Sequence, residues 1–91
     1  MKLEEYREKI DAVDEKLVAL FAERMELSRA IAEYKKENGL PVLDASREKE
    51  KLKSAAERSP AGLREYTRRL YALLFELSRD YQRELIGKER G

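Results

Sequence analysis

Arg24 is a charged residue at a position where the pattern of the surrounding chain predicts an apolar one. Apolar residues recur in steps of three and four, as on the buried face of a long amphipathic helix, at Leu3, Tyr6, Ile10, Val13, Leu17, Leu20, Leu27, Ile31 and Tyr34. Arg24 lies one heptad after Leu17 and one before Ile31, so its guanidinium should face inward. Burying an unpaired guanidinium costs several kcal/mol. It therefore needs an anionic ligand, a carboxylate of the protein, or a polar layer of the kind that fixes register in coiled coils.

Lys35 is the second cation on this face. It follows Arg24 by eleven residues, very close to three full turns, so both side chains should project from one side of the helix with room for a small ligand between them. In the last third of the chain, Ser78 and Gln82 form an i, i+4 pair at the border of another apolar stripe. The alternatives are ordinary: Lys35 could be a solvated helix end, and Ser78 and Gln82 could satisfy backbone groups.

The segment "DASRE" adds two acceptors and a cation within about one helical turn, namely Asp44, Arg47 and Glu48. Asp at such a place often serves only as a helix cap. Together with the residues above, however, the set comprises cations, an amide, a hydroxyl and two carboxylates that converge between helices. Such a set indicates a pocket for a small polyanion that carries a hydroxyl group.

The composition excludes several classes of protein. The 91 residues make one domain, 1–91, whose 20 Lys and Arg and 19 Asp and Glu are interspersed, which argues against nucleic acid or a membrane surface as a partner. No stretch has the apolar length of a membrane span or the features of a secretion signal, so a cytoplasmic protein is expected. Without His or Cys, the usual near-neutral acid–base group, the thiolate nucleophile and the common zinc ligands are missing. An enzyme built from this chain would work by binding and electrostatics.

Three helices must position the candidate residues in an all-α fold. The expected helices cover about residues 2–38, 44–58 and 60–86. Gly39 and Pro41 end the first, Asp44 caps the second, and Ser59 caps the third with Pro60 in its first turn. At about 1.5 Å per residue the first helix is over ~50 Å long, so its own chain cannot cover it. A short helical chain of this kind often completes its core with a second copy.

Three segments that carry these residues closely resemble the all-helical class of chorismate mutase. They are "YREKIDAVDEKLVALFAERMELS", "YKKENGLPVLDASREKE" and "LFELSRDYQ", which together extend over nearly the whole chain. The resemblance implies an intertwined homodimeric bundle with one very long, one short and one long helix per chain. It also implies an isomerase of aromatic amino-acid biosynthesis that converts chorismate, a dicarboxylate with an enolpyruvyl ether, into prephenate. That intramolecular Claisen rearrangement needs no nucleophile, acid, base, metal or cofactor.

The resemblance also implies roles for the residues of the reaction centre. Arg24 and Arg7 would hold carboxylates, while Lys35 and Gln82 would hydrogen-bond the ether oxygen, which gains charge as the C–O bond breaks. Arg7 lies ~25 Å along the helix from Arg24 and about 100° around it, so the two cannot grip one small molecule from the same straight helix. Arg7 must come from a second subunit, in an antiparallel pairing that crosses near Val18.

The remaining matching positions are implied to surround the substrate. Arg47 and Ser78 would help to position a carboxylate and the pocket wall. Asp44 and Glu48 would meet the ring hydroxyl and the Lys35 ammonium. With these roles, every polar position of the family pattern has an occupant in this chain.

Two other functions are compatible with parts of the pattern. Isochorismate pyruvate lyase shares this fold and much of this cationic pocket, although the Asp-x-x-Arg-Glu start of the second helix favours the mutase. A non-catalytic helical interaction or regulatory module has no need to place Arg24, Ser78 and Gln82 together at apolar borders. One departure from the family is Arg79, where a smaller apolar residue is common.

Overall fold

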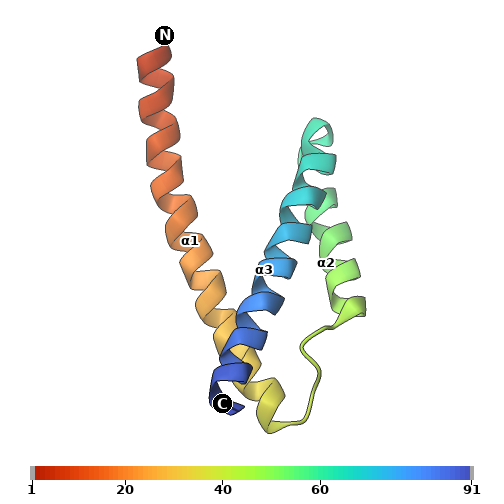
Figure 1. Ribbon diagram of the computed structural model, residues 1–91. Coiled ribbons are helices and arrows are strands. Elements are labelled where there is room, and N and C mark those ends of the chain that lie inside the picture. The colour runs from red at the N-terminus through yellow and green to blue at the C-terminus, as the bar shows by residue number, and fades with distance from the viewer. Residues whose placement is uncertain (1, 91) are drawn as a thin grey trace.

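Three α-helices and one 3-10 turn form the part of the chain that the computed structural model describes, residues 2–90, with side chains described for residues 2–87. In chain order they are α1 (Leu3–Glu37), α2 (Ala45–Arg58), η1 (Ala61–Leu63) and α3 (Arg64–Arg90). α2 packs along α3, α3 crosses the C-terminal half of α1, and the N-terminal half of α1 projects away from both (Figure 1). The predicted all-α fold of one very long, one short and one long helix is confirmed. Met1 and Gly91, the ends of the expected domain, lie outside the described residues.

The turn after α1 depends on a glycine, as the sequence predicts. Gly39 has a φ of 63°, in the left-handed region that residues with a Cβ rarely adopt. The backbone N–H of Gly39 donates to the Lys36 carbonyl oxygen at 3.4 Å, and that of Leu40 to the Lys35 carbonyl oxygen at 2.8 Å. These bonds satisfy the last carbonyls of α1 and fix the direction in which the loop leaves the helix.

α2 covers one side of α3 with a narrow apolar face. The Asp44 carboxylate accepts a hydrogen bond from the backbone N–H of Arg47 at 3.0 Å, so the predicted cap is present. Ala55 and Ala56 are the residues that α2 buries, with 6% and 1% of their surface exposed. Because these side chains are so small, the two helices can approach closely, and α2 serves as a wall of the site more than as a part of a large core.

The start of the third helix differs from the prediction. The 3-10 turn η1 comes first, the α-helix begins at Arg64 instead of residue 60, and it continues to Arg90. Ser59 ends α2 and does not cap α3, because its hydroxyl lies 2.9 Å from the Ala55 carbonyl oxygen and 2.7 Å from the Thr67 hydroxyl. Ser59 therefore ties the end of α2 to α3 across the turn.

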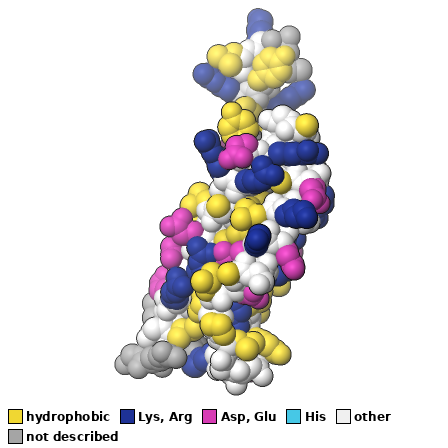
Figure 2. Space-filling view, turned by 90° about the vertical axis from the view of Figure 1, so that its right-hand side faces the viewer, with side chains coloured by type: hydrophobic (Ala, Val, Ile, Leu, Met, Phe, Trp, Pro, Cys, Tyr) yellow, Lys and Arg dark blue, Asp and Glu magenta, His cyan; other side chains and the backbone are white. Residues whose placement is uncertain are grey.

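A single chain leaves most of its large apolar side chains exposed. Leu3, Leu17 and Leu20 on α1 have 61%, 56% and 62% of their surface accessible, whereas the apolar residues buried among those described are Ala32, Ala55, Ala56 and Phe75. Apolar side chains are visible on the projecting end of α1 in Figure 2. Between α1 and α3 lies an open apolar groove of about 490 Å³, whose lining is Leu17, Val18, Leu20, Phe21, Arg24, Leu70, Tyr71, Leu73, Leu74 and Leu77. Among the helices described, none has the length and apolarity to cross a membrane.

Replacing Gly39 by Ala tests the turn. A Cβ at Gly39 meets nothing within 4 Å, so the penalty comes from the positive φ alone. We expect Gly39→Ala to lower the free energy of unfolding by about 1–2 kcal/mol. The matched control is Gly62→Ala, which also adds a Cβ into open space but at a glycine without a positive φ. Urea unfolding at one fixed protein concentration measures both, and equal stabilities would contradict the assigned turn.

Candidate active site

The candidate site is an open cavity of about 430 Å³ bordered by the C-terminal half of α1, the following loop, the start of α2 and the middle of α3. It collects seven of the eight residues singled out in the sequence, which are Arg24, Lys35, Asp44, Arg47, Glu48, Ser78 and Gln82. The eighth, Arg7, lies on the projecting part of α1, where its guanidinium is exposed and 3.6 Å from the Glu4 carboxylate. Within one chain, therefore, Arg7 is not part of the cavity.

Arg24 is half-buried and has no carboxylate partner among the described residues. Its guanidinium carbon lies 5.6 Å from the centre of the Phe75 ring, an arrangement typical of a cation–π contact. Phe75 is itself buried, at 8% exposure. The internal ion pair that the sequence left open is thus absent within the described chain, and the charge of Arg24 is available to an anion in the cavity.

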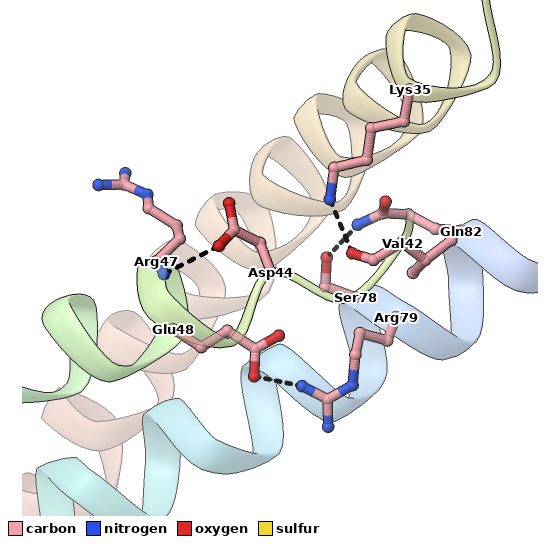
Figure 3. Close-up of polar contacts among 8 residues, drawn as sticks. All are labelled: Lys35, Val42, Asp44, Arg47, Glu48, Ser78, Arg79 and Gln82. Carbon is pink, nitrogen blue, oxygen red and sulfur yellow. Dashed lines mark hydrogen bonds and ion pairs between the residues drawn. The ribbon is translucent and has the colours of Figure 1, made fainter. Parts of the chain in front are cut away.

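Lys35 ties α1 to the loop that follows it. Its ammonium donates a hydrogen bond of 2.7 Å to the carbonyl oxygen of Val42. In Figure 3 the ammonium and the amide nitrogen of Gln82 lie on the same side of the site, near Ser78. An ammonium has three N–H donors, so the bond to Val42 leaves donor capacity for a ligand.

The start of α2 contributes charges of both signs. Glu48 pairs with the guanidinium of Arg79 on α3, and both side chains are about three-quarters buried. The contact expected between Glu48 and Lys35 is not formed, because Arg79 already holds this carboxylate and Lys35 donates to the loop. The guanidinium of Arg47 extends away from the group formed by Lys35 and Gln82 (Figure 3).

The α3 wall is held to α1 by buried polar groups. The amide nitrogen of Gln82 donates to the Ser78 hydroxyl at 3.1 Å, and this hydroxyl lies 2.7 Å from that of Ser28 on α1. The exposed fractions of Ser28, Ser78 and Gln82 are 4%, 9% and 5%. The sequence analysis missed Ser28. Its spacing in the sequence could have indicated it, because Ser28 is a small polar residue four positions after Arg24 and four before Ala32, and this spacing places all three on one face of the helix.

The charge of the cavity favours an anionic ligand. Its lining includes two carboxylates, those of Asp44 and Glu48, against five cations, which are Arg24, Lys35, Arg47, Lys51 and Arg79. The described residues include no group of three or more Asp, Glu, His or Cys side chains placed to hold a metal ion. Cationic and amide donors without such a cluster suit the binding of carboxylates and of a polar oxygen.

Comparison with known proteins agrees with this geometry. A chorismate mutase from Methanocaldococcus jannaschii is 48% identical over 48 residues, which cover 53% of this chain and 48% of that protein. A bifunctional chorismate mutase/prephenate dehydratase from Buchnera aphidicola subsp. Schizaphis graminum is 35% identical over 86 residues, 91% of this chain and 22% of that protein. The match thus spans about half of the first relative and less than a quarter of the second. The pattern of the chorismate mutase type II family covers residues 6–83, and the chain therefore belongs to that family.

Proposed function

We propose that this chain is a chorismate mutase that converts chorismate into prephenate. One observation carries the proposal: a cavity of suitable size gathers an ammonium, an amide and a guanidinium that has no carboxylate partner in the described part of the chain, all on fixed helices. The reaction moves electrons within one molecule, breaking a C–O bond while a C–C bond forms. Donors held in place before the reaction are sufficient for such a step.

The proposed roles are those that the family resemblance implies, and the positions of the donors support them. Arg24 binds one substrate carboxylate, since no carboxylate among the described residues neutralises it. Lys35 and Gln82 donate to the ether oxygen, and their nitrogens lie on one side of the site (Figure 3). As the C–O bond lengthens, this oxygen gains negative charge, so both hydrogen bonds strengthen in the transition state and lower the barrier.

The other polar residues complete the proposed pocket. Glu48, held by Arg79, keeps acceptor capacity for the ring hydroxyl, and Asp44 offers a second acceptor beside it. Ser78 supports the Gln82 amide. Arg47 would bring its guanidinium to a substrate carboxylate by a change of side-chain rotamer, since its backbone is fixed by the α2 cap.

We further propose that two copies form an antiparallel dimer in which Arg7 of each chain enters the site of the other. The open apolar groove beside Leu17 and Val18 supports this, because it lies where such a pairing would cross. The exposed apolar seam of α1 supplies the matching surface. The cytoplasmic location and the single-domain organisation stay predictions.

The direct test is to add purified protein to chorismate and follow the loss of its absorbance, with the product identified by chromatography and mass spectrometry. Prephenate as the product supports the proposal. Unchanged chorismate contradicts it and favours a non-catalytic helical module. Isochorismate is the second substrate to try, since release of pyruvate from it would indicate the lyase of the same fold.

Removing either central cation should abolish most of the activity. We expect Arg24→Ala and Lys35→Ala each to lower kcat/KM by at least ~10²-fold, the scale of losing one preorganised donor in an enclosed site. Arg29→Ala is the control, because Arg29 lies on the same helix but pairs with Glu26 and Glu33 at the surface. Near-native activity in either site variant, with circular dichroism showing an intact fold, would refute the assigned roles.

The shared site predicts complementation between inactive chains. Arg7→Ala and Arg24→Ala homodimers should both be inactive, whereas a heterodimer of the two has one site with both arginines intact. Mixing them under conditions of subunit exchange should restore up to about a quarter of wild-type activity, since half of the dimers are mixed and each has one good site of two. No recovery after verified exchange would contradict a site built from two chains.

A Gln82→Glu variant tests the contact with the ether oxygen by its pH dependence. A carboxylate cannot donate a hydrogen bond and repels the developing charge, while the protonated acid can donate. An anionic substrate raises the pKa of the new carboxyl above about 4.3 and Lys35 opposes this, so activity should recover below about pH 5 to 6. We expect kcat of the variant, which reports the enzyme–substrate complex, to rise as the pH falls from about 8 to 4.5 while the wild type stays much flatter. Parallel profiles would show that Gln82 does not touch the reacting oxygen.

A further inference from the structure

A continuous chain of buried hydrogen bonds links the amide of Gln82 to the backbone of α1. Gln82 Nε2 donates to Ser78 Oγ at 3.1 Å, the hydroxyls of Ser78 and Ser28 are 2.7 Å apart, and Ser28 Oγ donates to the Arg24 carbonyl oxygen at 3.1 Å. The three side chains are the buried polar ones among those described. This series of hydrogen bonds ends at the carbonyl oxygen of Arg24, a residue that lines the cavity.

Counting the available protons shows which group donates and which accepts in each of these hydrogen bonds. A serine hydroxyl has one proton to donate. Ser28 uses its proton on the Arg24 carbonyl, so in the contact between the two hydroxyls Ser78 is the donor and Ser28 the acceptor. The proton of Ser78 is then committed, and its oxygen can only accept from Gln82. The amide must therefore turn its nitrogen, not its oxygen, toward Ser78.

This orientation leaves one group without a partner. Gln82 Oε1 is buried and accepts no hydrogen bond from the described residues. Turning the amide by 180° would let the Ser78 hydroxyl donate to Oε1, but the bond from Ser78 to Ser28 would then be lost, and with it the donation from Nε2. The observed pattern has one more hydrogen bond, and Ser28 supplies that difference. Without Ser28 this difference disappears, because each orientation then makes one bond with Ser78, and only the turned amide gives the buried Oε1 a donor.

We propose that Ser28 is a positioning residue that sets the orientation of the Gln82 amide through Ser78 and so presents an N–H to the reacting oxygen. The proposal rests on the function proposed above, since it concerns the same oxygen. Figure 3 shows the Gln82 nitrogen on the side of Ser78 and the Lys35 ammonium, with Oε1 turned away. Loss of Ser28 would exchange the two ends of the amide and remove this N–H from the site.

The first test determines to which group the Ser78 hydroxyl donates, and it does so from the pKa of an introduced carboxyl group instead of from enzyme activity. In a Gln82→Glu variant, Ser78 can accept from the protonated acid, and it can donate to the carboxylate only by giving up its hydrogen bond to Ser28. In Ser28→Ala/Gln82→Glu, the Ser78 hydroxyl is free to donate to the carboxylate and should lower its pKa by about one unit. A purely structural effect has the opposite sign, since removing the buried hydroxyl of Ser28 makes the surroundings less polar and favours the neutral acid.

NMR titration of ¹³C-labelled glutamate carboxyl groups measures both pKa values in the protein without substrate. The new carboxyl is the resonance that the wild type lacks. The charged groups around the new carboxyl are the same in both variants, so their effects on its pKa cancel in the comparison. They come from α1, from α2 with its cap and from α3, and are Arg24, Lys35, Asp44, Arg47, Glu48, Lys51 and Arg79. In a Ser78→Ala background the two pKa values should coincide. An unchanged or higher pKa in the double variant would overturn the proposal.

The second test measures the effect on the reaction. We expect Ser28→Ala alone to lower kcat by about 5-fold with little change in KM, the scale of misdirecting one hydrogen bond. The matched control is Ser59→Ala, because Ser59 also lies near the carbonyl four residues earlier and a hydroxyl of α3, but far from the cavity. The control should keep wild-type kcat. Full kcat in Ser28→Ala would overturn the proposal, while a wild type inactive on chorismate would refute the proposed function and leave the titration to decide the role of Ser28.

Discussion

The crossing of α1 and α3 at Ser28 is the contact on which the rest of the structure depends. Ser28 and Ala32 are small and buried, so the two helices approach closely there. The hydroxyls of Ser28 and Ser78 meet across the crossing at 2.7 Å. On one side of this point the helices enclose the polar cavity, and on the other they diverge into the apolar groove. One close contact thereby separates the site from the exposed apolar groove.

The guanidinium of Arg24 lowers the stability of the fold and, for the same reason, leaves a positive charge available to an anion. A half-buried guanidinium that lacks a carboxylate partner destabilises a fold, and the Phe75 ring offsets only a part of that loss. An internal carboxylate would stabilise the chain, but it would also neutralise the charge that an anionic substrate needs. The apolar residue predicted by the heptad pattern would pack well and bind nothing. The departure from the pattern is therefore the feature that most directly indicates function.

The sequence was sufficient for those parts of the site that helix geometry alone determines. Arg24 and Lys35 share a cavity because eleven residues make about three turns, and Ser78 lies one turn from Gln82 for the same reason. Contacts between helices could not be foreseen in this way. The pairing of Glu48 with Arg79 and the bond between Ser28 and Ser78 depend on how α2 and α1 pack on α3, which no periodicity specifies. The same holds for Ser59, whose hydroxyl has partners on both sides of a turn.

The N-terminal half of α1 links assembly to chemistry. A helix of about twenty residues with few tertiary contacts is only marginally stable in water, and its stability comes from burial of its apolar face. That face is exposed in the single chain, and Arg7 lies on the same segment. In the proposed dimer, the burial that orders this segment also delivers Arg7 to the partner's cavity. The apolar seam and the substrate-binding guanidinium of Arg7 would then be selected together, because in the proposed dimer neither contributes to the site without the other.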